Sequence, residues 1–486
     1  MSAKINRGVA WTAASQAIVA VSDLFSQLIV VAVWLNETQY GIAMMAVPLY
    51  SILDTAADLG VTSALIQRDD HTPEAVATVF WFNMLLSTGL FLVLLVVGPM
   101  YGRLQGYDIV GWLLIAYGGK LLVQNLYAIP YALLRKELKF AEIAKIRTVA
   151  YLAESVSRIV FAAFGITIWC FTLAALVKTL VFAVLMMAIH PYWPKLVFRP
   201  REVMPYLRFG LRSAASQLLY YVYTNLDYPI VAYYFGAAAN GIYALAYWIV
   251  LEAVKTIANV VIDVAFPTFA RLRDDRRGVI REFIKLTRLN LIAVLPFVVL
   301  ILLIVPEFLR IAYGGGQWDA DQLAVCADAS RILCAVGLLR ALGFIGPPLL
   351  DGIGRPGLTL RYMAFAAIVV PGFFVLCSEL FGDQIGLLSV AVGWAVGYPI
   401  AFVVLSYLVV RAIDLPVGNY LRGSWTIVAC AAGGLAVGLV ASLAMRGAGD
   451  VARMVVVGGS GLVVTFGLLA VWQKITPRSV ARAIRG

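Results

Sequence analysis

Residues 76–98 read VATVFWFNMLLSTGLFLVLLVVG, a run of 23 residues without a charged side chain. About 20 apolar residues in a helix cross the hydrocarbon core of a bilayer, so this run predicts a membrane-spanning helix. Apolar stretches of similar length recur along the chain, and together they predict about fourteen such helices. The expected ranges are 10–35, 43–66, 76–98, 110–134, 148–164, 167–189, 209–235, 238–270, 289–305, 323–349, 358–378, 385–410, 425–444 and 454–472.

The composition excludes an ordinary soluble protein. The chain has 486 residues, of which 62% are hydrophobic and 13% are charged, whereas soluble domains carry about 25% charged residues. Too few polar side chains remain to cover a water-facing surface, so we predict an all-α integral membrane protein. The cysteines are scattered along the chain without a metal-ligand spacing, and they predict neither a disulfide framework nor a metal centre. They are Cys170, Cys326, Cys334, Cys377 and Cys430.

The basic residues indicate how the helices are oriented. Of the 38 Lys and Arg residues, 28 lie in loops on the side of the N-terminus and 4 in loops on the other side. Cytoplasmic loops of membrane proteins carry such an excess of positive charge. The sequence therefore predicts an even number of spans with both termini in the cytoplasm. The net charge of +11 is then a feature of topology rather than of nucleic-acid binding.

Three short motifs recur in the same order, at offsets of 201, 200 and 205 residues. Two copies of a six-helix unit that enter the membrane from the same side would form a parallel repeat with a pseudo-two-fold axis along the membrane normal. The recurring motifs are Ala13–Gln16 with Ala214–Gln217, Gly41-Ile42 with Gly241-Ile242, and Arg68–Asp70 with Arg273–Asp275.

This repeat predicts the domain organisation. A six-helix lobe at 1–189 is followed by a proline-rich cytoplasmic linker at 190–208 and a second six-helix lobe at 209–412. The remaining segment, 413–486, is expected to hold two extra helices and a basic tail. Because these two helices contain almost no charge, we expect them to face lipid.

Six basic residues lie inside the apolar segments, where a charge costs roughly 2.5–3.5 kcal/mol on insertion scales. Such residues are expected to face a polar path or a partner, and we take them as candidates for binding an anionic substrate. The alternative for three of them is pairing with an acid on the same helix face: Arg158 with Glu154, Lys255 with Glu252 and Arg331 with Asp328. The other three, which have no acid at helical spacing, are the stronger candidates: Lys120, Lys178 and Arg340.

Polar and acidic residues in two further places suggest other roles. Asp54 and Asp58 are four residues apart and share a helix face, so they are candidates for holding H⁺ or Na⁺; the alternative is that each pairs with a base on another helix. Asp227 and Glu252 join them as candidate ion-coupling residues. The seventh predicted helix presents hydroxyl, amide and aromatic groups that suit sugar rings, although tyrosines are also common at membrane interfaces. The candidates there are Gln217, Tyr221 and Asn225.

Two nearby segments carry a family resemblance. Asp58–Arg68 reads DLGVTSALIQR and Thr78–Asn83 reads TVFWFN. Together they resemble a signature of bacterial polysaccharide flippases, the Wzx-type exporters of lipid-linked oligosaccharides. The resemblance is nearest to the colanic-acid and exopolysaccharide exporters of the multidrug/oligosaccharidyl-lipid/polysaccharide superfamily. The chain length, the helix number and the two lobes agree with that family.

The resemblance implies a function. The substrate would be an oligosaccharide repeat unit on an undecaprenyl pyrophosphate carrier, moved from the cytoplasmic to the periplasmic leaflet of the bacterial inner membrane by alternating access. The product would serve exopolysaccharide or lipopolysaccharide synthesis. No cofactor is expected apart from a coupling ion, H⁺ or Na⁺. The expected partners are membrane lipid and, in the same pathway, a polysaccharide polymerase and glycosyltransferases.

Other functions remain open at this point. A peptidoglycan-precursor flippase would use similar cationic residues, and a multidrug or cation exporter of the same superfamily would favour an acidic cavity. A membrane glycosyltransferase or polymerase is disfavoured because the longest predicted outer loop, 306–322, is short. The sequence also contains no P-loop, GxSxG or HExxH motif, and we predict that the chain is not an enzyme.

Overall fold

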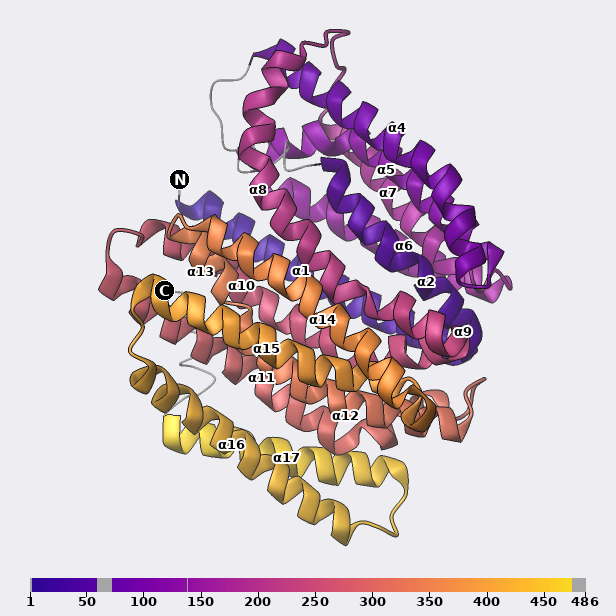
Figure 1. Cartoon of the computed structure of the whole chain (residues 1–486), viewed down its shortest axis with the longest axis vertical. Helices are drawn as coiled ribbons and strands as arrows, with labels where there is room; N and C mark the ends of the chain where they lie inside the picture. The colour runs from indigo at the N-terminus through magenta and orange to yellow at the C-terminus, as the bar shows by residue number, and fades with distance from the viewer. Residues whose placement is uncertain (1, 59–71, 138, 474–486) are drawn as a thin grey trace. The chain divides into compact units, whose positions relative to one another are not determined.

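The computed structural model describes residues 2–58, 72–137 and 139–473, and in these ranges every regular element is a helix (Figure 1). The chain forms two compact units, residues 1–241 and 242–486. The first contains α1 (Ser2–Val33), α2 (Glu37–Asp58), α4 (Pro73–Leu104), α5 (Asp108–Lys136), α6 (Phe140–Ala163), α7 (Cys170–Ile189), α8 (Pro200–Asn225) and most of α9 (Asp227–Tyr247).

The second unit begins within α9. It continues with a π-helical turn, η1 (Trp248–Glu252), and then α10 (Ala253–Arg271), α11 (Arg276–Tyr313), α12 (Ala320–Gly343), α13 (Gly346–Gly352), α14 (Pro356–Ile385), α15 (Leu388–Ile413), α16 (Val417–Ala444) and α17 (Asp450–Gln473). The boundaries predicted for the two lobes, 1–189 and 209–412, stay a prediction.

The helix ends follow local chemistry. At the start of α4 the hydroxyl of Thr72 accepts a hydrogen bond from the Ala75 amide, and Pro73 occupies the first turn, where its missing N–H is not needed. At the start of α11 the Asp275 carboxylate accepts from the Gly278 amide at 3.0 Å. Such caps satisfy backbone groups that the first turn leaves without partners.

Within the described residues, ten helices are long and apolar enough to cross a membrane. The predicted all-helical membrane fold is confirmed. Helices α6, α8 and α10 are not among the ten, and α6 carries acidic and basic residues in its interior. These more polar helices contribute many of the candidate functional side chains.

Two predicted helix boundaries differ from the structure. Residues 200–208, predicted as linker, form the start of α8, because Pro200 at the first helical position has a φ already suited to a helix. The span predicted at 323–349 lies within one candidate membrane span, Ala320–Gly352, although a short turn at 344–345 divides it into α12 and α13 ahead of Pro347, which lacks the N–H of a continuous helix. The turn predicted between 235 and 238 coincides with Gly236, which has φ 82°.

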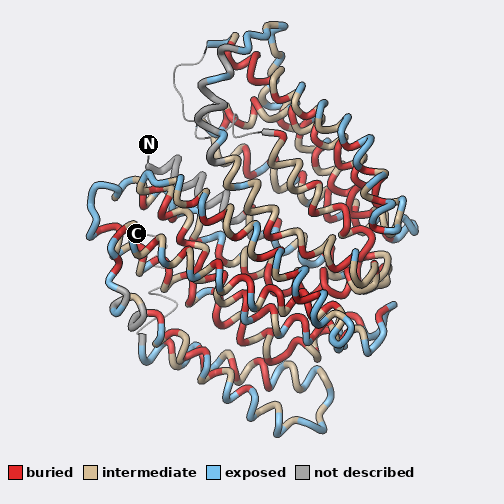
Figure 2. The backbone as a smooth tube through the Cα atoms, viewed as in Figure 1, coloured by how far each residue is buried: buried red, intermediate tan, exposed pale blue. Residues whose placement is uncertain are grey.

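Helices α16 and α17 pack against α11 along one side. Val457 of α17 and Ile427 of α16 share an apolar core with Leu295 of α11. Residues on their other side, such as Val463, are exposed. Figure 2 shows this alternation of buried and exposed residues along both helices. Gly458 and Gly461 let one side of α17 approach α11 closely, and the expectation that these two helices face lipid stays a prediction for the exposed apolar side.

Candidate functional site

A cluster of charged side chains joins α1, α6 and α7. The Nζ of Lys178 on α7 lies 2.9 Å from Oε2 and 3.0 Å from Oε1 of Glu154 on α6. Arg158, one turn along α6, has Nη2 3.9 Å from Glu154 Oε1 and Nη1 2.9 Å from Asp23 Oδ1 on α1. Glu154 and Arg158 are buried. Buried ions are tolerated when they are paired, and each charge of this cluster has an opposite charge beside it, although Arg158 Nε has no hydrogen-bond partner.

The position of Arg158 is set by further contacts. Its Nη1 donates to Ser26 Oγ at 3.1 Å, and its guanidinium lies 5.1 Å from the ring centroid of Phe171. The predicted pairing of Arg158 with Glu154 is thus present but is longer than its pairing with Asp23. Lys178 has no acid at helical spacing on α7, and it pairs instead with Glu154 on the neighbouring helix α6.

Lys120 of α5 reaches α2 through a tyrosine. Its ammonium donates to the hydroxyl of Tyr50 and lies 4.5 Å from the centroid of the same ring. The Tyr50 hydroxyl donates in turn to Asp54 Oδ1 at 2.9 Å. Tyr117 stacks on Tyr50 with centroids 4.4 Å apart. One hydroxyl therefore connects a cation and a carboxylate. In this arrangement a change of charge at Asp54 alters the electrostatic environment of Lys120.

A cavity of about 410 Å³ lies beside these groups; Asp54 is in its lining, whereas the predicted cations Lys120, Arg158 and Lys178 are not. Asp54 lines it on α2, and Tyr151 lines it on α6, where the ring carries Lys178 Nζ 4.6 Å from its centroid. Asn125 is held at the wall by its amide, which donates to Ser87 Oγ at 2.7 Å. The other lining residues are Ala57, Leu121, Gln124, Tyr127, Ala128, Tyr131, Arg135, Ile143, Arg147 and Phe182.

Two arginines give the cavity a positive balance. The Arg147 guanidinium lies 5.6 Å from the Tyr151 centroid, and that of Arg135 lies 5.7 Å from the Tyr131 centroid. Asp54 is the one acidic residue among the lining side chains. Arginine binds phosphate oxygens with two parallel hydrogen bonds, while tyrosine offers a flat face and a hydroxyl. The cavity therefore suits an anionic ligand with polar rings.

Sequence reasoning assigned Arg135 and Arg147 to a cytoplasmic loop and missed their part in this cavity. The signal was present in their spacing. Tyr127, Tyr131 and Arg135 follow each other at four-residue intervals, as do Arg147 and Tyr151, so each set lies on one helix face. The helices α5 and α6 extend beyond the predicted apolar spans and carry these residues with them.

The predicted cations of the second unit are in different surroundings. Arg340 of α12 is buried, donates from Nη1 to the Tyr247 hydroxyl at 3.1 Å and lies 5.4 Å from the Trp394 centroid. Lys255 pairs with Glu252 at 2.9 Å. The exposed Arg331 pairs with Asp328, also at 2.9 Å, as helical spacing predicts. A role in substrate binding stays a prediction for all three cations.

The polar residues predicted on the seventh span lie on α8, which packs against α2 and α4. Gln217 is exposed, and Tyr221 is half-buried. The Asn225 amide donates to the Tyr221 carbonyl at 3.0 Å. Asp227 is buried at the start of α9, where its Oδ1 accepts from the Tyr228 amide. The side chain of Asp58 lies outside the described residues, as does the segment 59–68 of the family signature.

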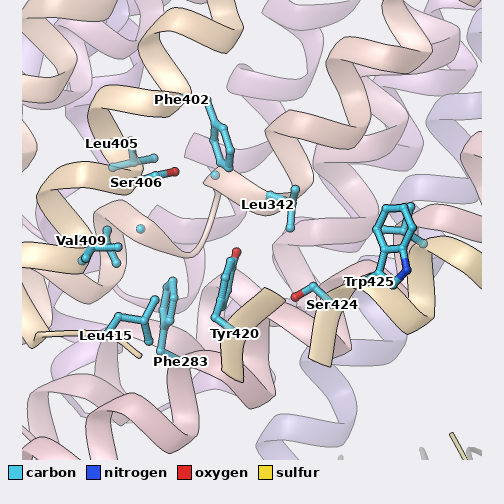
Figure 3. A pocket seen from close by; sticks show the side chains of 14 residues that line it. Phe283, Leu342, Phe402, Leu405, Ser406, Val409, Leu415, Tyr420, Ser424 and Trp425 are labelled. Atoms are coloured by element: carbon cyan, nitrogen blue, oxygen red, sulfur yellow. The ribbon is translucent and has the colours of Figure 1, made fainter. Parts of the chain in front are cut away.

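A larger cavity in the second unit is of a different kind. Its volume is about 610 Å³, and its lining contains no charged side chain. Figure 3 shows Phe402, Leu405 and Val409 facing Phe283 and Tyr420 across it. With no cation to balance a phosphate, this cavity is not the candidate site for an anionic head group.

The sequence also matches a known family model, over residues 30–321, described as polysaccharide biosynthesis protein. This chain belongs to that family. The predicted resemblance to polysaccharide flippases is thereby confirmed. The matched region includes Glu154, Arg158 and Lys178 of the charged cluster and the cavity beside it, but not Asp23.

Two curated proteins are similar to this chain over most of its length. The lipopolysaccharide biosynthesis protein WzxC of Escherichia coli (strain K12) is 26% identical over 415 residues, which are 83% of this chain and 80% of that protein. The succinoglycan biosynthesis transport protein ExoT of Rhizobium meliloti (strain 1021) is 22% identical over 395 residues, 80% of this chain and 76% of that protein.

The fold is similar to that of solved transporters. The lipid II flippase MurJ in an inward closed conformation superposes with a TM-score of 0.71 at 14% identity, covering 96% of this chain and 98% of that one. The relative ExoT is named as a transport protein, and the prediction that this chain is a transporter and not an enzyme is confirmed. It is a multi-pass membrane protein of polysaccharide biosynthesis.

Proposed function

We propose that this protein moves an oligosaccharide repeat unit, carried on undecaprenyl pyrophosphate, from the cytoplasmic to the periplasmic leaflet of the bacterial inner membrane. Family membership supports polysaccharide transport. The positive-inside pattern supports cytoplasmic termini. Alternating access would expose the polar path to each side in turn, and a polymerase and glycosyltransferases would use and supply the substrate.

The observation that carries this proposal is the cavity with Arg135 and Arg147 beside three tyrosine rings. A pyrophosphate is bound by cations that donate two parallel hydrogen bonds, and the two guanidiniums can do so. Sugar rings pack on aromatic faces, and the rings of Tyr127, Tyr131 and Tyr151 offer such faces. A cation exporter would need the opposite charge balance in this cavity.

Asp54 is the proposed coupling residue. It lines the cavity and accepts a hydrogen bond from Tyr50, which also accepts one from Lys120. Binding of H⁺ or Na⁺ at Asp54 would cancel its negative charge and leave the Lys120 charge unbalanced. An anionic substrate would then be attracted, and release of the ion would reverse this effect. The cavity would thus alternate between two affinities for the same substrate.

The test is translocation in proteoliposomes. A fluorescent undecaprenyl-pyrophosphoryl oligosaccharide is incorporated, and its exposure to a membrane-impermeant quencher is followed in time. We expect Arg135→Gln and Arg147→Gln each to lower the rate roughly 10- to 100-fold. This is the effect of losing one hydrogen bond between a charged arginine and the substrate. Arg103→Gln, at an exposed position at the end of α4, is the matched control.

The outcomes separate the function from the site. Unchanged rates in both cavity variants would remove the site assignment and leave the transport of glycans in place. Expulsion of a cationic dye, with no movement of any lipid-linked glycan, would overturn the proposed substrate class. Equal loss in Arg103→Gln would show that the assay reports stability rather than substrate contact.

A further inference from the structure

The first turns of α11 carry a stripe of basic residues that the proposed transport path does not use. Arg277, Arg281, Lys285 and Arg288 follow at intervals of four, four and three residues, so they share one helix face. The opposite face is buried in the second unit through Val279, Phe283 and Leu286. The basic stripe therefore lies on the exposed face of α11, while the opposite face packs inside the second unit.

Isoleucine and leucine side chains lie between these cations. Arg277, Arg281, Lys285 and Arg288 line, with the apolar residues, a groove of about 610 Å³. Glu282 lies 3.2 Å from Lys285 and offsets one positive charge, but the groove lining has four cations and no acid, so its balance stays positive. The apolar lining residues are Ile280, Ile284, Leu289, Ile292 and Pro416.

The far wall of the groove is tied to α11. Arg276 forms an ion pair with Asp414 in the segment between α15 and α16, and its Nε donates to the Ile413 carbonyl at 3.1 Å. Phe283 stacks on Tyr420 of α16 with centroids 5.7 Å apart. These contacts hold Pro416 beside α11, so the groove is built by packing rather than by one exposed helix.

The chemistry of the groove selects an anionic amphiphile. A free anion would need the cations and gain nothing from the apolar lining, whereas a neutral lipid would leave the cations unused. A phospholipid with a negatively charged head group uses both, since basic residues beside a membrane attract anionic lipids and the isoleucines accept the first part of an acyl chain. We propose that this groove is a binding site for an anionic phospholipid, distinct from the substrate path.

The positive-inside rule alone predicts basic residues near this end of α11, but not their arrangement. Arg273 belongs to the same basic segment and is exposed, yet it lies outside the groove and next to Asp274. A purely topological role would make Arg273 and Arg281 equivalent. A lipid site would make them different, and this contrast supplies the control.

The experiment measures lipid binding to the full-length protein in neutral detergent. Fluorescent phosphatidylglycerol is titrated against the wild type, Arg281→Gln, Lys285→Gln, their double variant and Arg273→Gln, with fluorescent phosphatidylcholine in a parallel series. We expect wild type to prefer phosphatidylglycerol. Each groove substitution should weaken it by about fivefold, and Arg273→Gln should not. Ile284→Ser should weaken phosphatidylglycerol binding with all charges retained.

Three results would overturn the proposal. One is equal weakening by Arg273→Gln, which indicates a diffuse surface charge. Another is equal affinity for phosphatidylcholine. The third is displacement of phosphatidylglycerol by millimolar inorganic phosphate, which would identify a phosphate site without a lipid component. Elution of every variant at the wild-type volume in size-exclusion chromatography, expected at these surface positions, excludes misfolding as a cause of lost binding.

Discussion

Gly41 of α2 and Gly241 of α9 pack against each other in a reciprocal contact. A Cβ atom on Gly41 would overlap the carbonyl of Ala237, and a Cβ atom on Gly241 would overlap the carbonyl of Glu37. The Asn240 amide donates to the Gly41 carbonyl at 2.9 Å. The two glycines are 200 residues apart and belong to the repeated Gly-Ile motif. Both glycines lie in the first compact unit, so this contact helps to hold α2 and α9 together within it.

This contact makes a stability prediction. Gly41→Ala and Gly241→Ala should each destabilise the protein by about 1–3 kcal/mol, because backbone on the facing helix has to move. Gly119→Ala, in the interior of α5 with open space around its Cβ, should be neutral or stabilising by up to about 1 kcal/mol. Thermal unfolding in detergent, followed by tryptophan fluorescence, would measure the difference. Similar midpoints for Gly41→Ala and Gly119→Ala would contradict the close contact.

The Glu154 carboxylate balances the charges of Lys178 and Arg158. Removing Glu154 alone should therefore lower the stability of the fold more than removing Glu154 and Lys178 together. We expect Glu154→Gln to destabilise by about 3 kcal/mol, since Lys178 and Arg158 are left close together with less compensation. The double variant Glu154→Gln/Lys178→Met should recover much of that loss. A midpoint of thermal unfolding that is lower in the double variant than in Glu154→Gln would argue against this view of the cluster.

The Tyr50 hydroxyl is predicted to connect the proposed coupling residue to Lys120. Tyr50→Phe keeps the ring beside Tyr117 and removes the hydrogen bonds to Asp54 and Lys120. Translocation driven by an imposed H⁺ or Na⁺ gradient should fall roughly tenfold, while movement without a gradient changes little. Tyr101→Phe, which loses a hydroxyl bonded to the Met45 carbonyl, is the control. An unchanged gradient dependence in Tyr50→Phe would remove this connection from the mechanism.

An ion network holds the start of α17 to the end of α11. Arg453 Nε lies 2.9 Å from Oε1 of the buried Glu307, and Arg310 contacts Asp450 through Nη2 at 2.7 Å and Nε at 3.0 Å. We expect Arg453→Gln to cost about 3 kcal/mol because Glu307 loses its nearest cation. Arg446→Gln, in the exposed turn between α16 and α17, should be neutral. Comparison of the two unfolding midpoints tests this.

Much of the helical layout was predictable because it depends on local sequence. A long apolar run satisfies its backbone hydrogen bonds within one helix, so residues such as those of 76–98 form a span wherever the helix is placed. The turn at Gly236 was also predictable, because the predicted spans 209–235 and 238–270 leave only a short connection there. The start of α8 at Pro200 was not predictable. The proline-rich segment 190–208 is typical of a linker, although one of its prolines is the first residue of a helix.

The candidate site was only partly predictable. Spacing along one helix identified Glu154 near Arg158, and both residues belong to the observed cluster. It could not find Lys178 beside Glu154, or Asp23 beside Arg158, because these pairs join different helices. The sequence predicts Arg135 and Arg147 as loop charges, because only the packing of α5 against α6 places both at one cavity.

The sequence by itself determined that this chain is an α-helical membrane protein, since bilayer insertion depends on the hydrophobicity of each segment and orientation on the charge of each loop. It also identified the family through a short signature. Only the tertiary structure decided which buried charges meet and which residues share a cavity. Those choices depend on how the helices pack against one another, and contacts between distant segments leave no periodic trace in the sequence.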